Sequence, residues 1–264
     1  MSRAIKDEIK KLGASEYEQL YVHDVYDRIA HHFSDTRYKP WPKVKAFVER
    51  GMQPEKPLTS QPSEGNSHPS LPFHQMLWID IGCGNGKNFP TTTGCSVPNG
   101  FGFDTCSKLI DIASRATKGN ANFLVADAMH MPFRSNIFHG GICIAVLHHI
   151  TTVERRTRIL QECARILAPG AHLLLYSWAH EQEKVQSVEQ DVLVPWKLRK
   201  TSTTATVKDS KESSPVFASV ESRFCHLYEK NEIEDLISAH CRDNLRVVQS
   251  YYDRENWAVI CQKR

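Results

Sequence analysis

The sequence lacks the features that mark membrane-spanning, secreted and fibrous proteins. Its best apolar run covers residues 140–147, far short of the roughly 18 residues that a membrane helix needs. The first twelve residues alternate in charge around no apolar core, so we expect no secretory signal. No internal repeat is present. These absences predict a protein that does not enter a membrane, with a cytoplasmic location expected and a nuclear one left open.

Cysteine pattern and net charge exclude further classes. The eight cysteines are scattered singly, and none forms a CxxC pair or joins a histidine-rich cluster of zinc-binding spacing. We therefore expect no metal site, and reduced thiols in an intracellular compartment. The net charge of +3 is compatible with nucleic acid but too small to indicate it.

The chain contains enough apolar material for a sizeable core. It has 264 residues, of which 41% are hydrophobic. Residues 15–33 have the helical spacing of apolar side chains, and Ser15 and Glu18 are placed to form a capping box at the start. A second, shorter helix at residues 44–49 follows a proline-rich break. We therefore expect an N-terminal helical cap over residues 1–50.

Two segments have the composition of irregular insertions. Residues 52–76 hold five of the thirteen prolines and no periodic apolar pattern. Residues 197–215 are rich in serine and threonine and carry five basic residues against two acidic ones. We expect a single domain, residues 1–264, that contains both insertions.

Strands and helices alternate between these insertions. Thr151 and Glu154 are placed to cap the helix that follows the fourth strand. The predicted strands cover residues 77–81, 100–104, 122–127, 141–147 and 172–177, followed by a helix at 229–240 and a hairpin of strands at 245–251 and 256–262. This order predicts an α/β fold with a mostly parallel sheet and an antiparallel C-terminal hairpin, which binds ligands at the carboxyl ends of its strands.

A glycine loop follows the first predicted strand. Asp80 precedes Gly82, Gly84 and Gly86, and this G-x-G-x-G spacing differs from the dinucleotide motif G-x-G-x-x-G. Glycines let the backbone turn tightly and approach a ligand closely, which suits a small zwitterionic group such as the methionine part of S-adenosylmethionine. The alternative is an ordinary strand-to-helix turn.

Acidic residues at the next two strand ends favour the cofactor interpretation. Asp104 ends the second strand, where it can accept both ribose hydroxyls. Asp127, followed by Ala128, ends the third, where an acid can accept from an adenine amino group. Each acid alone is compatible with a helix cap or a turn. Together with Asp80 they have the layout of a class I, Rossmann-like, S-adenosylmethionine-dependent methyltransferase.

Motifs along nearly the whole chain resemble one family. They are RYKPWP at residues 37–42, DIGCGNGK at 80–87, IAVLHH at 144–149, QDVLVPW at 190–196 and QSYYDRENW at 249–257. The chain resembles the eukaryotic tRNA wobble-uridine carboxymethyl methyltransferases, including the methyltransferase domain of the AlkB-type tRNA modification enzyme. RYKPWP and DVLVPW are the most specific matches, because a generic methyltransferase fold needs neither.

The resemblance implies methyl transfer from S-adenosylmethionine to the carboxylate of 5-carboxymethyluridine at tRNA position 34. The products are the ester 5-methoxycarbonylmethyluridine and S-adenosylhomocysteine. Because a carboxylate is already ionised at pH 7, the enzyme needs no general base and has to orient the reactants and exclude water. We expect His148 to lie near the methyl group and Arg37 to hold the carboxylate, with His149 structural. The alternatives are a hydrogen-bonded strand-end histidine and a surface ion pair.

The resemblance also implies an RNA substrate and a protein partner. The wobble base would leave the tRNA anticodon loop and enter a pocket that Tyr26 helps to line, while lysine and arginine contact phosphates. The phosphate candidates, whose alternative role is a solvated helix face or loop, are Arg155, Arg156, Lys197, Arg199 and Lys200. The partner is a small zinc-binding activator protein that forms a heterodimer with the chain, and we expect the strand at residues 122–125 to be its contact edge.

Two other functions stay open from the sequence alone. A small-molecule methyltransferase would have the same glycine loop and strand-end acids but no reason to contain RYKPWP. An inactive, cofactor-binding paralogue that acts as an interaction module is compatible with Thr105 and Ile150, which differ from the residues usual in the family.

Overall fold

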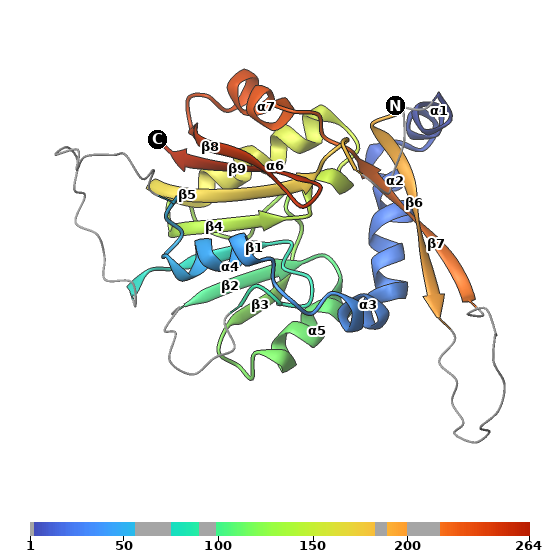
Figure 1. Ribbon diagram of the computed structural model, residues 1–264, viewed down its shortest axis with the longest axis horizontal. Coiled ribbons are helices and arrows are strands. Elements are labelled where there is room, and N and C mark those ends of the chain that lie inside the picture. The colour runs from blue at the N-terminus through green and yellow to red at the C-terminus, as the bar shows by residue number, and fades with distance from the viewer. Residues whose placement is uncertain (1–2, 56–74, 90–98, 183–188, 200–216) are drawn as a thin grey trace.

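The computed structural model describes residues 3–55, 75–89, 99–182, 189–199 and 217–264, which form a seven-stranded sheet with helices on both faces and a separate two-stranded ribbon (Figure 1). No helix in these ranges has both the length and the apolar character needed to span a membrane. In chain order, the elements are α1 (Arg3–Leu12), α2 (Ala14–Glu18), the π-helical turn η1 (Gln19–His23), α3 (Asp24–Thr36), α4 (Pro42–Glu49), β1 (Trp78–Ile81), β2 (Gly100–Asp104), α5 (Ser107–Ala116), β3 (Asn122–Val125), β4 (Phe138–Ile144), the 3₁₀ turn η3 (Leu147–His149), α6 (Val153–Ile166), β5 (Leu167–Trp178), β6 (Asp191–Arg199), β7 (Phe217–His226), α7 (Glu232–His240), β8 (Leu245–Asp253) and β9 (Asn256–Lys263).

The sheet has the strand order β3-β2-β1-β4-β5-β9-β8. The five strands from β3 to β5 are parallel, and β9 lies antiparallel between β5 and β8. The predicted fold class, a mostly parallel α/β sheet with an antiparallel C-terminal hairpin, is confirmed. Because the order of the parallel strands reverses between β1 and β4, the carboxyl ends of these two strands flank the crevice in which such sheets bind ligands.

Strand alternation sorts the core onto the two faces of the sheet. Ile79 and Ile81 of β1 belong to the apolar cluster that α6 and α7 cover, whereas Trp78 belongs to the cluster under α4 and α5. All three side chains are almost completely buried. A strand covered on both faces has to be apolar throughout, which is why β1 shows no polar alternation except at Asp80.

The ribbon of β6 and β7 packs on the N-terminal helices rather than on the sheet. Tyr17 and Val22 pack with Phe224 of β7, while Val25 and Ile29 pack with Trp196 of β6. Figure 1 shows the ribbon running alongside α2 and α3. The ribbon was not predicted from the sequence, and its second strand, β7, follows residues that are outside the described ranges.

Both predicted capping boxes are wrong, for one shared reason. Helix α2 begins without a side-chain cap, and Glu18 instead accepts a hydrogen bond of 2.7 Å from the hydroxyl of Thr151. Because Thr151 is used in this contact, α6 is capped by Thr152, whose hydroxyl accepts from the backbone N–H of Arg155 at 3.3 Å. Glu18 and Thr151, one residue from each predicted cap, form a long-range link instead.

The boundaries of the predicted insertions also change. Met52 is 1% exposed and packs in the core against Gly140 of β4, so the first insertion does not include it, and residues 56–74 lie outside the described ranges. Residues 197–199 belong to β6, and the rest of the second insertion, residues 200–215, lies outside the described ranges as well.

Candidate active site

A cavity lies where the sheet meets the N-terminal helices and the ribbon. Its walls come from the glycine loop after β1, the segments after β2, β3 and β4, helix α3 and both ribbon strands. The cavity therefore occupies the crevice that the strand order predicts. It brings together residues that are far apart in the sequence, from Glu18 to Arg223.

The glycine loop forms one side of this cavity. Gly82 and Gly84 have φ angles of 66° and 53°, a left-handed conformation that favours glycine. A Cβ atom on Gly82 would collide with Val146, whereas one on Gly84 would meet no atom closer than Phe33 Cε1 at 3.8 Å. Gly84 therefore borders open space. Gly86 has a packing role, because a Cβ there would lie 2.9 Å from the Cβ of Ala113 in α5.

Asp80 lies behind the glycine loop and not in the cavity wall. Its side chain is fully buried, and burial raises the pKa of the carboxyl to about 7. Its Oδ2 accepts a hydrogen bond of 3.1 Å from Nδ2 of Asn88, which does border the cavity. Among the described residues, neither Asp80 Oδ1 nor Asn88 Oδ1 has a hydrogen-bond partner. Two buried acceptors beside the loop thus lack a donor.

The other two strand-end acids border the cavity directly. The Asp104 carboxylate accepts backbone N–H bonds from Gly84 at 3.0 Å and Cys106 at 2.9 Å, which hold it in place. Burial nevertheless raises its pKa above the ordinary value. Asp127 is exposed and accepts from the backbone N–H of Met129 at 2.8 Å. Ala128 lies beside Asp127 in the wall.

This side of the cavity fits the groups of S-adenosylmethionine. The unpartnered oxygen of Asn88, with the buried Asp80 carboxyl behind it, suits an ammonium group, and an acid at the end of the second strand suits paired ribose hydroxyls. Gly84 leaves room for close approach. Of the predicted cofactor positions, Asp80 and Gly86 lie outside the cavity wall, and the others border it: Gly82, Gly84, Asp104, Asp127 and Ala128. Asn88, which was not predicted from the sequence, borders it as well.

His148 borders the cavity from the turn after β4. It is 1% exposed, and its Nδ1 accepts the backbone N–H of Trp178 at 3.3 Å, so its own proton is on Nε2. Burial, together with the positive charges of neighbouring groups, holds its pKa well below the usual range. His148 is thus a neutral N–H donor at neutral pH and not a base waiting to take a proton.

His149 is fixed by hydrogen bonds at both ring nitrogens. Nδ1 lies 2.7 Å from the carbonyl oxygen of Phe224, which can only accept, so Nδ1 carries the proton. Nε2 therefore accepts from the hydroxyl of Tyr26 at 2.9 Å. Burial lowers the pKa of His149 to about 3, so the imidazole stays neutral. The structural role predicted for His149 agrees with these contacts.

Opposite the glycine loop, three rings surround one cation. Tyr26, Trp178 and Trp196 border the cavity together with Arg223 of β7, and we call these four residues the aromatic wall. Tyr26 was predicted to line the pocket, whereas Arg223 was not predicted. No local motif marks Arg223, because its position depends on the unpredicted pairing of β6 with β7.

Arg37, the predicted carboxylate ligand, lies at the exposed rim of the cavity. Its guanidinium is 5.4 Å from the centre of the Trp196 ring, and Nη1 donates to the carbonyl oxygen of Thr36 at 3.2 Å. Its own carbonyl accepts from Asn85 Nδ2 of the glycine loop at 3.3 Å. Arg37 thus links the end of α3 to the loop.

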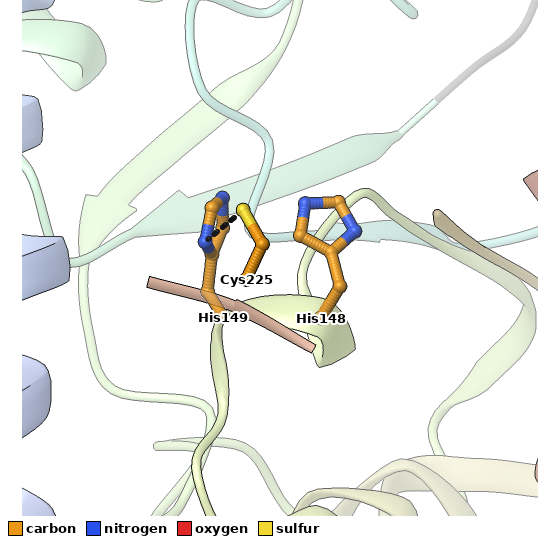
Figure 2. A group of neighbouring side chains, drawn as sticks. All are labelled: His148, His149 and Cys225. Carbon is orange, nitrogen blue, oxygen red and sulfur yellow. Dashed lines mark hydrogen bonds between the residues drawn. The ribbon is translucent and has the colours of Figure 1, made fainter. Parts of the chain in front are cut away.

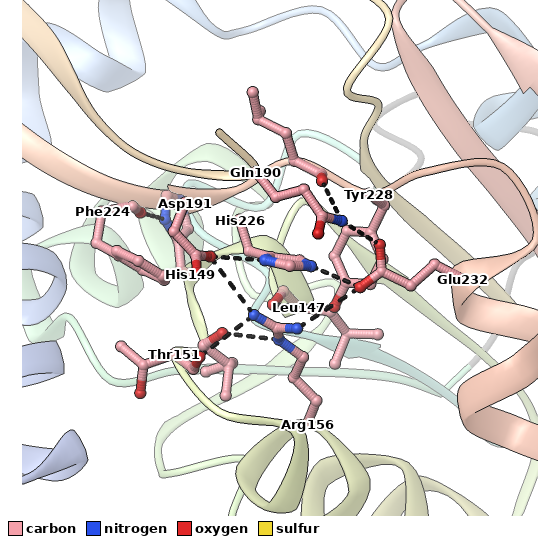
Figure 3. A network of polar contacts seen from close by, with 12 residues as sticks. Leu147, His149, Thr151, Arg156, Gln190, Asp191, Phe224, His226, Tyr228 and Glu232 are labelled. Atoms are coloured by element: carbon pink, nitrogen blue, oxygen red, sulfur yellow. Dashed lines mark hydrogen bonds and ion pairs between the residues drawn. The ribbon is translucent and has the colours of Figure 1, made fainter. Parts of the chain in front are cut away.

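Arg156 cannot contact RNA as predicted. It is 3% exposed, donates to the carbonyl oxygen of Ile150 at 2.9 Å, and lies 3.8 Å from carboxylate oxygens of both Asp191 and Glu232 (Figure 3). His226 bridges the same two acids with contacts of 2.6 Å to each. This buried network ties α6 to the ribbon and to α7, so the role of Arg156 is structural.

The other basic candidates differ in accessibility. Arg155 borders the cavity but is held by the buried Glu18, to whose Oε2 it donates from Nη2 at 2.7 Å. Lys197 is exposed on β6. Arg199 ends β6, and Lys200 lies outside the described residues.

Three buried residues with metal-ligand atoms lie close together, and two of them, His148 and His149, border the cavity. One ligand atom from each of His148, His149 and Cys225 lies within 4.8 Å of the others, and Figure 2 shows Cys225 against the His149 ring. However, Nδ1 of His149 is occupied by Phe224. Burial raises the pKa of Cys225 to about 12, so it remains a thiol. The donor set suits a neutral packed cluster, and we assign no metal to it.

Comparison with known sequences gives close relatives. A family model described as a methyltransferase domain matches residues 79–175. The chain is 36% identical over 257 residues to the tRNA (carboxymethyluridine(34)-5-O)-methyltransferase of Schizosaccharomyces pombe, which covers 94% of this chain and 98% of that relative. It is 31% identical to the Saccharomyces cerevisiae protein of the same name, over 95% of this chain and 98% of that relative.

Comparison with solved structures supports the fold. The chain is similar to a putative methyltransferase solved in complex with the Haloferax volcanii Trm112 methyltransferase activator, with a TM-score of 0.53 and 13% identity. The match covers 92% of this chain and 98% of that one. At this identity the likeness concerns the arrangement of helices and strands alone.

Proposed function

Because the chain belongs to the tRNA (carboxymethyluridine(34)-5-O)-methyltransferase family, we propose that it esterifies the carboxylate of 5-carboxymethyluridine at tRNA position 34, using S-adenosylmethionine. The observation that carries this function is 36% identity along nearly the whole of both chains. The cavity adds support, since it joins a cofactor-type glycine loop to a second, aromatic side that could receive a base.

The cofactor would lie on the glycine-loop side. Gly82 and Gly84 would border its methionine part, Asp80 would act through Asn88 on the amino group, and Asp104 would accept from the ribose. Asp127 and Ala128 would contact the adenine. Bound there, S-adenosylmethionine supplies a sulfonium methyl group that a carboxylate oxygen can take directly, with the bonding pair returning to sulfur and no proton transferred.

The residues of the chain would then orient the substrate and keep water out. The substrate carboxylate is ionised at neutral pH and needs no base. His148, which is neutral and carries its proton on Nε2, would donate a hydrogen bond to the substrate. Tyr26 and the tryptophans of the aromatic wall would flank a wobble base that has left the anticodon loop. Arg37 and Lys197 stand at accessible positions for contact with the RNA backbone.

We further propose that a small zinc-binding activator docks on β3. This strand is one edge of the sheet, and Val125 on it is 55% exposed. The opposite edge, β8, has a register irregularity between Val247 and Gln249, and such bulges block the addition of a further strand. The pairing of β3 with β2 is regular, so β3 is the edge that suits strand addition. A heterodimer is the expected assembly.

The decisive experiment is methyl transfer by the chain co-expressed with its activator. The substrates are a tRNA carrying 5-carboxymethyluridine and the same tRNA with uridine at position 34, with nucleoside mass analysis as the readout. We expect the methyl ester from the first tRNA only, and a strong loss of ester with Asp104→Ala. The surface variant Arg246→Met is the matched control, since this exposed side chain lies on β8 away from the cavity.

Two results would contradict this function. Cofactor binding without transfer to any RNA would favour the inactive interaction module. Transfer to small carboxylic acids but not to tRNA would favour a small-molecule enzyme.

A further inference from the structure

Arg223 is a buried cation without a counter-ion. The residue is only 5% exposed, yet it borders the cavity. None of the ion pairs between described residues includes it, and its Nε has no hydrogen-bond partner among those residues. A charge removed from water is costly unless it is paired, so a ligand that supplies the missing negative charge would offset this cost.

The neighbours of Arg223 hold the guanidinium without neutralising it. Its centre lies 4.6 Å from the Trp196 ring and 5.8 Å from the rings of both Trp178 and Tyr26. Nη1 donates to the Tyr26 hydroxyl at 3.1 Å, and that hydroxyl donates onward to His149. Aromatic faces attract a cation without carrying a formal charge. The guanidinium is thus oriented, and donors remain for a further acceptor.

The titratable groups near Arg223 are uncharged at neutral pH. Its charge contributes to the lowered pKa values of both His148 and His149, which keeps these imidazoles neutral. Cys225 stays a thiol because burial raises its pKa to about 12. The side chains that contact the Arg223 guanidinium, those of Tyr26, Trp178 and Trp196, carry no negative charge, so this part of the cavity suits an anionic ligand.

We infer that Arg223 binds the carboxylate of the substrate base, the role that sequence analysis gave to Arg37. This inference rests on the proposed function. Arg37 is less suited, because it is exposed at the rim and donates to its own neighbour, Thr36. Arg223 instead lies on the wall that includes Trp178, whose ring stacks on His148 at 5.1 Å. A planar guanidinium and the neutral N–H of His148 then meet one carboxylate from adjoining positions.

This assignment makes the site selective for the charge of its ligand. The acid substrate supplies the counter-ion that Arg223 lacks, whereas the methyl ester is neutral and leaves the guanidinium unpaired again. The ester and other neutral derivatives therefore bind more weakly than the acid. Esterification thus removes the ion pair between the substrate carboxylate and Arg223, which favours release of the product.

The test measures RNA affinity for the full chain with its activator, saturated with S-adenosylhomocysteine so that nothing reacts. The ligands are anticodon stem-loops with 5-carboxymethyluridine, its neutral carbamoylmethyl analogue, or the methyl ester at the wobble position. For the wild type we expect the acid to bind about 10- to 150-fold more tightly than either neutral form, the range of a hydrogen bond to a charged group. Arg223→Met should abolish this preference, and Arg223→Lys should retain part of it.

The controls separate the possible failures. Arg246→Met should keep the full preference, and Arg37→Met should weaken all three RNAs to a similar extent. The inference is overturned if Arg223→Met keeps the preference for the acid, or if Arg37→Met loses it. Methyl transfer by the wild type would still support the proposed function in either case. If Arg223→Met does not fold, a wild type that binds acid and ester equally also overturns the inference. A wild type that methylates no 5-carboxymethyluridine overturns the proposed function itself.

Discussion

At the scale of single residues, Asp80 acts on the cavity indirectly. The sequence places it at the head of the glycine loop, but its carboxyl is buried and reaches the cavity only through Asn88. Burial disfavours the ionised form and raises the pKa to about 7. In the free protein, this group contributes stability at low pH that is lost as the pH rises towards 7.

We predict that the affinity for S-adenosylmethionine depends on Asp80 and on pH. A bound ammonium group favours the ionised carboxyl, so binding below pH 7 requires the loss of a proton from Asp80. Between pH 7 and pH 6 the dissociation constant should therefore rise by up to about tenfold, the limit for one coupled proton. Asp80→Asn should weaken binding at pH 7.5 and remove this dependence, as measured by calorimetry. The exposed Asp111→Asn on α5 is the control, and a flat wild-type profile would contradict the prediction.

At the scale of elements, the two edges of the sheet differ in what they offer a partner. Strand β3 is four residues long, with Phe123 packed on Phe89 at 4.8 Å between ring centres and Val125 turned to solvent. Strand β8 carries an equally apolar residue, Val248, which is 41% exposed but lies at the register irregularity. An exposed valine on a regular edge strand is the stronger indication of a docking surface.

We expect Val125→Lys to prevent formation of the heterodimer without unfolding the chain. A lysine on an edge strand disfavours the pairing of a further strand, and position 125 has few contacts within the chain. Co-purification with the activator and size-exclusion chromatography measure the outcome. Val248→Lys, on the opposite edge, should leave the complex intact. Equal loss of the partner with both substitutions would show that β3 is not the specific contact.

At the scale of the whole molecule, the central sheet could be predicted from the sequence better than the ribbon of β6 and β7 and the residues that depend on it. Period, glycine and proline signals located β1, β2, β4 and the C-terminal hairpin, because each is marked within a few residues. The ribbon was missed because 17 residues, 200–216, separate β6 from β7 in the sequence and show no pattern typical of a hairpin turn. Arg223 was missed with it, and Arg156 was misplaced because its exposure depends on Asp191 and Glu232, which approach only in the folded chain.

One buried carboxylate joins the two halves of the molecule. Glu18 is 1% exposed and accepts from the backbone N–H and hydroxyl of Thr151 at 2.8 and 2.7 Å, and from the guanidinium of Arg155. The link connects the N-terminal helices to the segment between β4 and α6. Since the cavity lies between these parts, its shape depends on this link.

Glu18→Gln should destabilise the fold strongly. It leaves the Arg155 guanidinium without its counter-ion in a mostly buried site, and breaking a buried ion pair costs about 3–5 kcal/mol; because Arg155 keeps some exposure, we expect a value near the lower end. Urea unfolding measures the change. The neighbouring Glu16→Gln is the matched control, because Glu16 is exposed on the same helix. A loss below about 1 kcal/mol would mean that the other contacts between these parts, such as the Tyr26–His149 hydrogen bond, hold them together without the Glu18 link.

The aromatic wall and the residues packed behind it keep the same charge as the pH changes. His148 and His149 stay uncharged at pH values well below 7, and Tyr26 and Cys225 keep their protons at pH values well above 7. This side of the cavity consequently has a constant charge throughout the acidity range of living cells, while Asp80 on the other side titrates within it. We therefore expect acidification to weaken the binding of the methyl donor while the charge of the aromatic wall stays unchanged.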